Sequence, residues 1–163
     1  MIKHLSFCLC SMILLYMISC QEPKPTAPTF EEEKAAILAT INNETKAAFQ
    51  RDYESWQSKW VHAPYVVKTY IEFPDSSFSE SLGWEKINHF VKTYIEEHPE
   101  ADPLPELLAD IDVRLYGSGA WVSFEVDDEV RGLKRETRLM EKVEGKWKIA
   151  GMHTTIYGTQ KPD

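Results

Sequence analysis

Two side chains near the C-terminus, Arg135 and His153, are the first candidates for chemistry. Arg135 shares one face of its predicted strand with the more apolar residues. It is therefore expected to face the interior, where a guanidinium needs an anionic ligand or, the commoner case, a salt bridge. His153 is predicted to share a strand face with Trp147, Ile149 and Gly151, and Gly151 leaves space beside it. A histidine there could bind a ligand, act as a general base or, most commonly, hydrogen-bond a neighbouring backbone group.

A second group of candidates follows a run of aromatic residues. Tyr53, Trp56 and Trp60 are spaced three and four apart, so they share one face of a short helix and are expected in the core. Trp60 could also form the wall of a ligand cavity, because it lies next to the loop that carries His62 and Tyr65.

Motifs for metal or cofactor chemistry are missing from the sequence. The histidines at positions 62, 89, 98 and 153 have no HxxxH or HExxH spacing, so no metal is expected. The chain has no nucleophile motif, phosphate loop or dinucleotide fingerprint, and the glycines at positions 117 and 119 belong to a predicted strand turn. We therefore expect no cofactor.

The first twenty residues predict an export signal and not part of the domain. A short basic start, Lys3 and His4, precedes an apolar run that is too short to span a bilayer comfortably. The run ends at Ser19-Cys20 and resembles a bacterial lipoprotein signal, which implies lipidation of Cys20. Met17 departs from the leucine that is usual there, and an ordinary secretory signal or an uncleaved anchor is the alternative. The proline-containing segment 21–28 is expected to be an extended tether.

This interpretation places the domain in the cell envelope, anchored by lipid and facing the periplasm or the surface. By analogy with lipoprotein sorting, Gln21 after Cys20 favours the outer membrane. All three cysteines lie in the first twenty residues, so the chain that begins at Cys20 cannot form an internal disulfide.

The charge of the chain is acidic. The formal charge is -8, and without Lys3 the chain carries 17 basic against 26 acidic side chains, a formal charge of -9. An acidic domain with no basic cluster in its sequence argues against binding of nucleic acid and against direct adhesion to anionic lipid. We therefore expect the lipid anchor alone to explain a membrane location.

The elements that must position these residues can be read from periodicity and turn signals. Thr29 and Glu32 form a capping box that begins a helix ending near residue 51. A short helix over 53–60 and a long one over 84–98 are also predicted, with strands over 66–73, 111–116, 120–126, 133–143 and 146–157. The serine-rich segment 74–81 is expected to be a loop. Glu144-Gly145 is expected to close a tight hairpin.

This order of elements resembles the NTF2-like superfamily, in its SnoaL-like or DUF4440-like branch. The resemblance covers residues 30–157. It also depends on short local matches: residues 51–53 with Trp56, 83–85, 116–122, 135–138 and 144–149. It implies an α+β domain over 29–158, in which three N-terminal helices pack on a curved, mainly antiparallel sheet to form a cone, followed by a tail over 159–163. His62 and Tyr65 would then lie at the mouth of the cone.

The resemblance also implies homodimers that pair through the outer face of the sheet. Strand alternation assigns Glu136 and Arg138 to that outer face and Arg135 and His153 to the cavity. A proton-abstracting aspartate of the ketosteroid isomerase type is not visible, because Asp112 alternates away from Ile111 and Val113.

We therefore expect a non-catalytic domain that binds a small, partly apolar ligand in its cone or pairs with an envelope protein. A small isomerase or dehydratase that uses His153 with Tyr65 or His62, and a purely structural dimerisation module, are the alternatives.

Overall fold

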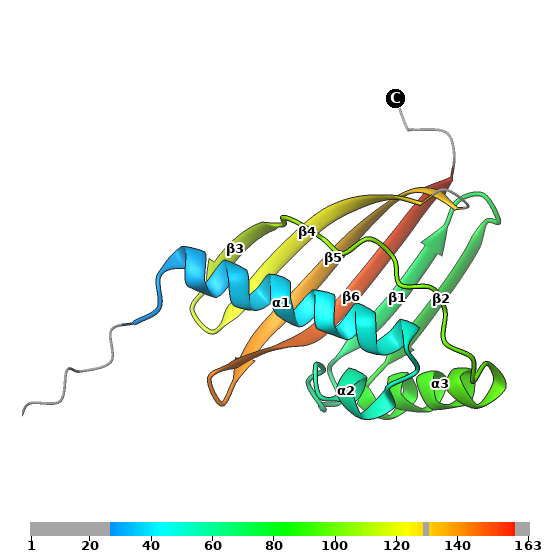
Figure 1. Cartoon of the computed structure of the whole chain (residues 1–163), viewed down its shortest axis with the longest axis horizontal. Coiled ribbons are helices and arrows are strands. Elements are labelled where there is room, and N and C mark those ends of the chain that lie inside the picture. Colours follow the sequence, from blue (N-terminus) through cyan, green and yellow to red (C-terminus); the bar gives the residue numbers. More distant parts are fainter. Residues whose placement is uncertain (1–26, 129–130, 159–163) are drawn as a thin grey trace, which may run out of the picture.

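The computed structural model describes residues 27–128 and 131–158, whose helices and strands are shown in Figure 1. The helices are α1 (Phe30–Phe49), α2 (Tyr53–Gln57) and α3 (Trp84–Glu97). The strands are β1 (Val67–Glu72), β2 (Ser77–Leu82), β3 (Asp112–Tyr116), β4 (Gly119–Asp128), β5 (Gly132–Val143) and β6 (Lys146–Gly158). The predicted signal with Cys20, the tether up to residue 26 and the tail over 159–163 lie outside the described residues.

The six strands form one curved, mixed sheet in the order β2-β1-β6-β5-β4-β3. The β1–β6 pair is parallel and every other pair is antiparallel. The predicted hairpin turn is confirmed, because Glu144 and Gly145 both adopt positive φ, at 51° and 76°. The α+β architecture expected from the sequence is therefore correct.

Strand β2 was not predicted. Its segment contains three serines and no apolar alternation, and most of its residues are exposed. It is an edge strand that pairs with β1 over six residue pairs, from Val67↔Leu82 to Glu72↔Ser77. Backbone pairing, and not burial, defines this strand, so a pattern of hydrophobic residues could not indicate it.

The helices cover one face of the sheet. Helix α1 begins at the predicted capping box, in which Thr29 and Glu32 satisfy each other's backbone amides, and then crosses the sheet, while α2 and α3 cover one end (Figure 1). The core between the layers contains Ile37, Ile41, Trp56, Trp60, Val66, Ile87, Val122, Met140 and Ile149. No helix among residues 27–128 and 131–158 is long and apolar enough to cross a membrane.

A bulge in β6 decides which side chains face the helices. Leu139 pairs with Gly151 and Met140 pairs with Ile149, so Ala150 is an extra residue in β6. The extra residue reverses the alternation of the strand. Trp147 and Ile149 face the helices before the bulge, and Met152, Thr154 and Ile156 are the buried residues after it. Strict alternation through the bulge therefore placed His153 on the wrong face.

Candidate functional site

The predicted pocket residues Arg135 and His153 lie on the outer face of the sheet. The Arg135 side chain is 53% exposed and its guanidinium donates to a Glu125 carboxylate oxygen at 2.6 Å. His153 is exposed and pairs in register with Thr137 and Thr69. Their expected orientation toward a cavity is wrong, and neither can line a site between the helices and the sheet.

The other three predicted pocket residues are occupied by their own neighbours. Tyr65 is exposed and its hydroxyl donates to Glu141 at 2.8 Å. His62 stacks on Trp84 with ring centroids 3.9 Å apart, and its Nε2 lies 2.9 Å from a backbone oxygen in α2. Trp60 is fully buried in the core. The five residues therefore do not line one common cavity, because two lie on the outer face and Trp60 is in the core.

Three charged side chains are buried between α1 and β5, and we call them the Arg138 cluster: Glu44, Glu136 and Arg138. Arg138 is 3% exposed, and its Nη2 donates to Glu136 Oε2 at 2.6 Å and lies 3.9 Å from Glu44 Oε2. Glu136 and Arg138 were expected on the outer face, and that expectation is wrong. Mutual charge compensation allows these polar residues to occupy the face that the apolar pattern had assigned to their neighbours.

Two tryptophans complete the shell around Glu44. The indole N–H groups of Trp56 and Trp60 donate to the same Glu44 oxygen, Oε1, at 2.8 and 3.2 Å. Buried indoles usually need an acceptor, and a buried carboxylate needs donors, so each group satisfies the other. The sequence contained a signal for this contact, because Glu44 follows Ile37 and Ile41 by seven and three positions on the buried stripe of α1.

Part of the hydrogen-bonding capacity of the Arg138 guanidinium is unused. Arg138 Nε and Nη1 are buried without a hydrogen-bond partner among the described residues, as is the Thr154 hydroxyl. These two nitrogens carry three of the five guanidinium N–H donors. Burial disfavours the charge, but Glu136 and Glu44 outweigh it and raise the pKa of Arg138. A permanently charged side chain therefore keeps N–H donors that the described residues do not satisfy.

Lys68 and Tyr70 of β1 lie on the same face of the sheet as the Arg138 cluster. Lys68 is in register with Met152 and so with Arg138, and Tyr70 is in register with Thr154 and so with Glu136. The Lys68 ammonium lies 5.2 Å from the Tyr70 ring centroid. Burial lowers the pKa of Lys68 to about 8, and burial raises the pKa of Tyr70 above its usual range.

This arrangement suits the recognition of an anion better than the binding of a metal. Among residues 27–128 and 131–158, no group of three or more histidine, cysteine, aspartate or glutamate side chains could hold a metal ion. Both cluster carboxylates already accept bonds from Arg138, Trp56 or Trp60, whereas donors remain unused. An oxyanion would accept from them, and hydrogen bonds between a charged donor and a charged acceptor are stronger than neutral ones.

Comparison with known proteins identifies the fold. No protein-family model matches the chain, and no curated protein matches it. Among solved structures, an NTF2-like superfamily protein from Salmonella enterica serovar Typhimurium aligns with a TM-score of 0.60 and 18% identity, covering 83% of this chain and 96% of that one.

Two other solved structures agree. A cystatin-like fold protein from Burkholderia xenovorans aligns with a TM-score of 0.58 and 22% identity, covering 77% of this chain and 92% of that one. A dehydratase candidate of the NTF2-like family from Streptomyces avermitilis aligns with a TM-score of 0.58 and 16% identity, covering 78% and 98%. The helices, the mixed curved sheet and these alignments show that the chain has the NTF2-like fold.

Proposed function

We propose that this domain binds a small, partly apolar carboxylate at Arg138, between the helices and the sheet, and that it does so without catalysis. The single observation that carries the proposal is the unused hydrogen-bonding capacity of this region, because two guanidinium nitrogens of Arg138 and the Thr154 hydroxyl are buried without partners among the described residues. A buried donor without an acceptor costs about 1–3 kcal/mol, so a site that keeps several of them gains by accepting a ligand.

The neighbouring side chains fit both halves of such a ligand. Val122, in register with Arg138, and Met152 are buried and apolar. Lys68 adds a second cation on the same face. The carboxylate would accept from Arg138 and Thr154, and its apolar part would lie against the valine and methionine.

Thermal shift and calorimetric titration with a panel of hydrophobic carboxylic acids test this proposal, because a ligand that binds the native state raises its stability. Arg138→Lys retains the charge but loses the fork of donors, and we expect at least tenfold weaker binding. Thr154→Val preserves the side-chain shape, and we expect affinity to fall about three- to tenfold.

Arg135→Lys is the matched control, because Arg135 belongs to the same strand but lies on the outer face. Its affinity should equal that of the parent chain. Two results would reject the ligand site in favour of a purely structural module. One is the absence of any stabilising acid, and the other is equal affinities for the Arg138, Thr154 and Arg135 variants.

A second candidate function, proton transfer, depends on Lys68 and not on the histidines. An amine whose pKa lies near 8 can accept a proton close to neutral pH. If the domain is an enzyme, Lys68→Met should abolish turnover, and it should weaken carboxylate binding less than Arg138→Lys does, because Arg138 would supply the direct hydrogen bonds. Equal turnover by the parent and the variant would remove this candidate.

We further propose that the mature chain is held in the cell envelope by a lipid on Cys20, as its signal sequence predicts. Fatty-acid labelling followed by membrane fractionation tests the anchor. Labelling should disappear, and the protein should leave the membrane, in a Cys20→Ser variant. A variant that still fractionates with the membrane would contradict the anchor.

We also propose that the domain forms a homodimer through the outer face of the sheet. An apolar row crosses that face in register: Trp121, Leu139, Gly151, Val67 and Leu82. Trp121, Leu139 and Leu82 are 48%, 38% and 55% exposed, which is unusual for large residues side by side. Leu139→Asp should convert a dimer into a monomer in light scattering, whereas Leu104→Asp, in the connector, should not. Identical masses for both variants would refute this interface.

A further inference from the structure

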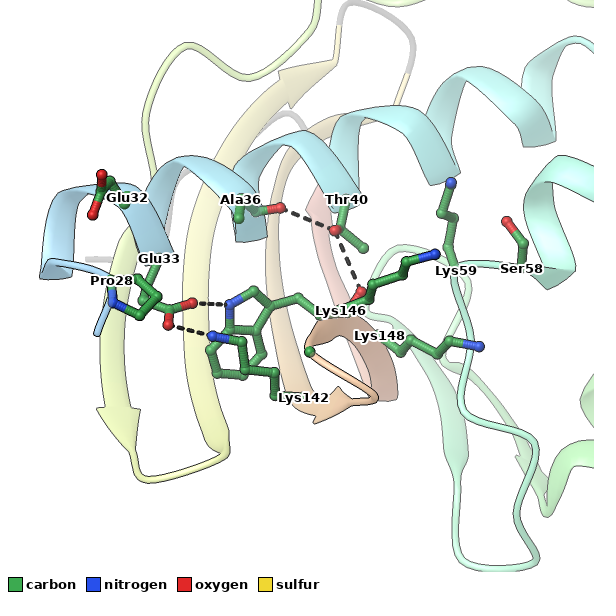
Figure 2. Close-up of a pocket in the computed structure, with 12 residues that line it drawn as sticks. Pro28, Glu32, Glu33, Ala36, Thr40, Ser58, Lys59, Lys142, Lys146 and Lys148 are labelled. Carbon is green, nitrogen blue, oxygen red and sulfur yellow. Dashed lines mark hydrogen bonds and ion pairs between the residues drawn. The ribbon is translucent and has the colours of Figure 1, made fainter. Parts of the chain in front are cut away.

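A groove separates the first half of α1 from the turn between β5 and β6, and its volume is about 390 Å³. Four lysines line it, Lys59, Lys142, Lys146 and Lys148, and we call it the lysine groove (Figure 2). Lys59 follows α2, whereas the other three lie at the ends of β5 and β6. The fold therefore assembles a basic cluster from positions that are more than eighty residues apart. The sequence-based expectation of no basic cluster does not hold in three dimensions.

The lining of the lysine groove is positively charged, because it contains four lysines and only two carboxylates, Glu32 and Glu33. Lys142 forms an ion pair with Glu33, which also accepts from the Trp147 indole at 2.6 Å. Glu32 accepts from the Thr29 backbone N–H at 2.7 Å. Among the described residues, none forms an ion pair with the three remaining lysines, Lys59, Lys146 and Lys148. Figure 2 shows the side chains of these three lysines on one side of the groove, away from the Glu33 pair.

The position of the groove in the chain connects it with the proposed anchor. Pro28 lines the groove, and the described chain begins at residue 27. Cys20 lies seven positions before residue 27. Because a residue spans at most about 3.6 Å, these seven residues reach about 25 Å at full extension. A lipid on Cys20 would therefore keep the lysine groove next to the membrane surface.

We infer that the lysine groove docks the anchored domain onto the phosphate groups of anionic lipids in the membrane that holds it. Lysine ammonium groups bind phosphate as flexible point charges, and a headgroup layer needs no fixed geometry. Each lysine close to an anionic surface strengthens attachment about fivefold. Three unpaired lysines would therefore strengthen attachment on the order of 100-fold, although the chain as a whole is acidic. The biological setting of this inference depends on the proposed lipid anchor, but its test does not.

The first experiment measures attachment of the chain from Cys20, which contains every described residue, without any lipid on the thiol. Co-sedimentation with vesicles of phosphatidylglycerol and phosphatidylethanolamine is compared with vesicles of phosphatidylcholine. We expect a clear preference for the anionic vesicles that weakens as salt rises. The triple variant Lys59→Gln, Lys146→Gln, Lys148→Gln should reduce attachment on the order of 100-fold.

The matched control removes the same number of positive charges from exposed positions outside the groove: Lys86→Gln, Lys92→Gln and Arg114→Gln. It should keep at least a tenth of the attachment of the parent chain. Equal losses in the two triple variants would overturn the docking surface, because net charge alone would then explain the binding.

The second experiment couples Cys20, the single cysteine left in this chain, to a maleimide lipid in the same vesicles. Hydrogen exchange should slow at residues 58–59 and 145–148 on anionic vesicles but not on phosphatidylcholine, and the groove variant should lose this protection. Equal exchange on both vesicles would overturn the inference even if cells do lipidate Cys20.

Inorganic phosphate and a single-stranded oligonucleotide complete the second test as soluble competitors. If the groove binds either competitor more tightly than it binds vesicles, that competitor and not the membrane would identify the ligand class of the groove.

Discussion

The Arg138 cluster and the lysine groove are both built from charged side chains, but they satisfy opposite conditions. In the cluster, every carboxylate has a partner and the guanidinium is shared between two glutamates. In the groove, three lysines have no carboxylate partner among the described residues, and water can solvate them. An unpartnered donor inside the fold is penalised by burial, and this penalty is the basis of the proposed ligand site. An unpaired charge on the surface is solvated by water, so it contributes only to the electrostatic potential of that surface.

The largest difference between the two regions should appear in stability. Arg138→Met leaves two buried glutamates without their cation, and we expect the free energy of unfolding to fall by about 3–5 kcal/mol in urea titrations. The control Arg135→Met removes an exposed cation from the same strand and should lower the free energy of unfolding far less. Similar losses for both variants would show that burial does not separate the two arginines.

The pH dependence of stability should identify Lys68 as part of the buried region. Its pKa in the folded protein is about 8, below the ordinary 10.5, so between these values the unfolded chain binds more protons. Below pH 8 both states are protonated, and the folded state carries the full burial penalty. Lys68→Met should therefore be more stable than the parent by about 1–3 kcal/mol at pH 7, and the gain should shrink as pH rises from 8 to 10.5.

Thermal unfolding of the parent and variant at several pH values measures this change. Lys86→Met is the control, because Lys86 is exposed on α3. Its difference from the parent should not vary over the same range. A constant difference for Lys68→Met as well would mean that Lys68 is solvated like Lys86.

The smallest effect on stability is expected in the lysine groove. Lys146→Gln with Lys148→Gln should change the free energy of unfolding by no more than about 0.5 kcal/mol, in either direction, because exposed charges contribute little. The urea midpoint should be unchanged in the parent and variant when salt is raised. A loss above about 2 kcal/mol would show that these lysines support the fold, and the contrast with Arg138 would fail.

Local signals in the sequence were sufficient for most elements of the fold. Thr29 and Glu32 indicated the start of α1, and Glu144-Gly145 indicated the hairpin, because capping and turn formation depend on residues that are adjacent in the chain. Strand β2 was missed because it is held by pairing with β1 at the edge of the sheet. Although its partner is the preceding strand, an exposed edge strand leaves little trace in the hydrophobic pattern of its own residues.

The candidate site was predicted less well, for two physical reasons. The extra residue Ala150 reverses the alternation in β6, and no local pattern marked it, so His153 was assigned to the interior. In β5, the apolar pattern favoured the face that carries Arg135. Glu44, seventy residues or more before β5, supplies compensation that allows Arg138 to be buried there. The lysine groove could not be predicted for the same reason. Lys59 is far from Lys146 and Lys148 in the sequence, and the three come together only in the folded protein.

Among the strands that the structure describes, β6 alone pairs with both halves of the sheet. The first half is the β1–β2 pair and the second is the β3–β4–β5 meander, and β6 pairs with both β1 and β5. A nascent chain that does not yet include these thirteen residues would hold two short sheets with open edges, which attract other chains. Completion of the domain is therefore controlled from its C-terminal end, and a chain stopped before Lys146 should aggregate and not fold partially.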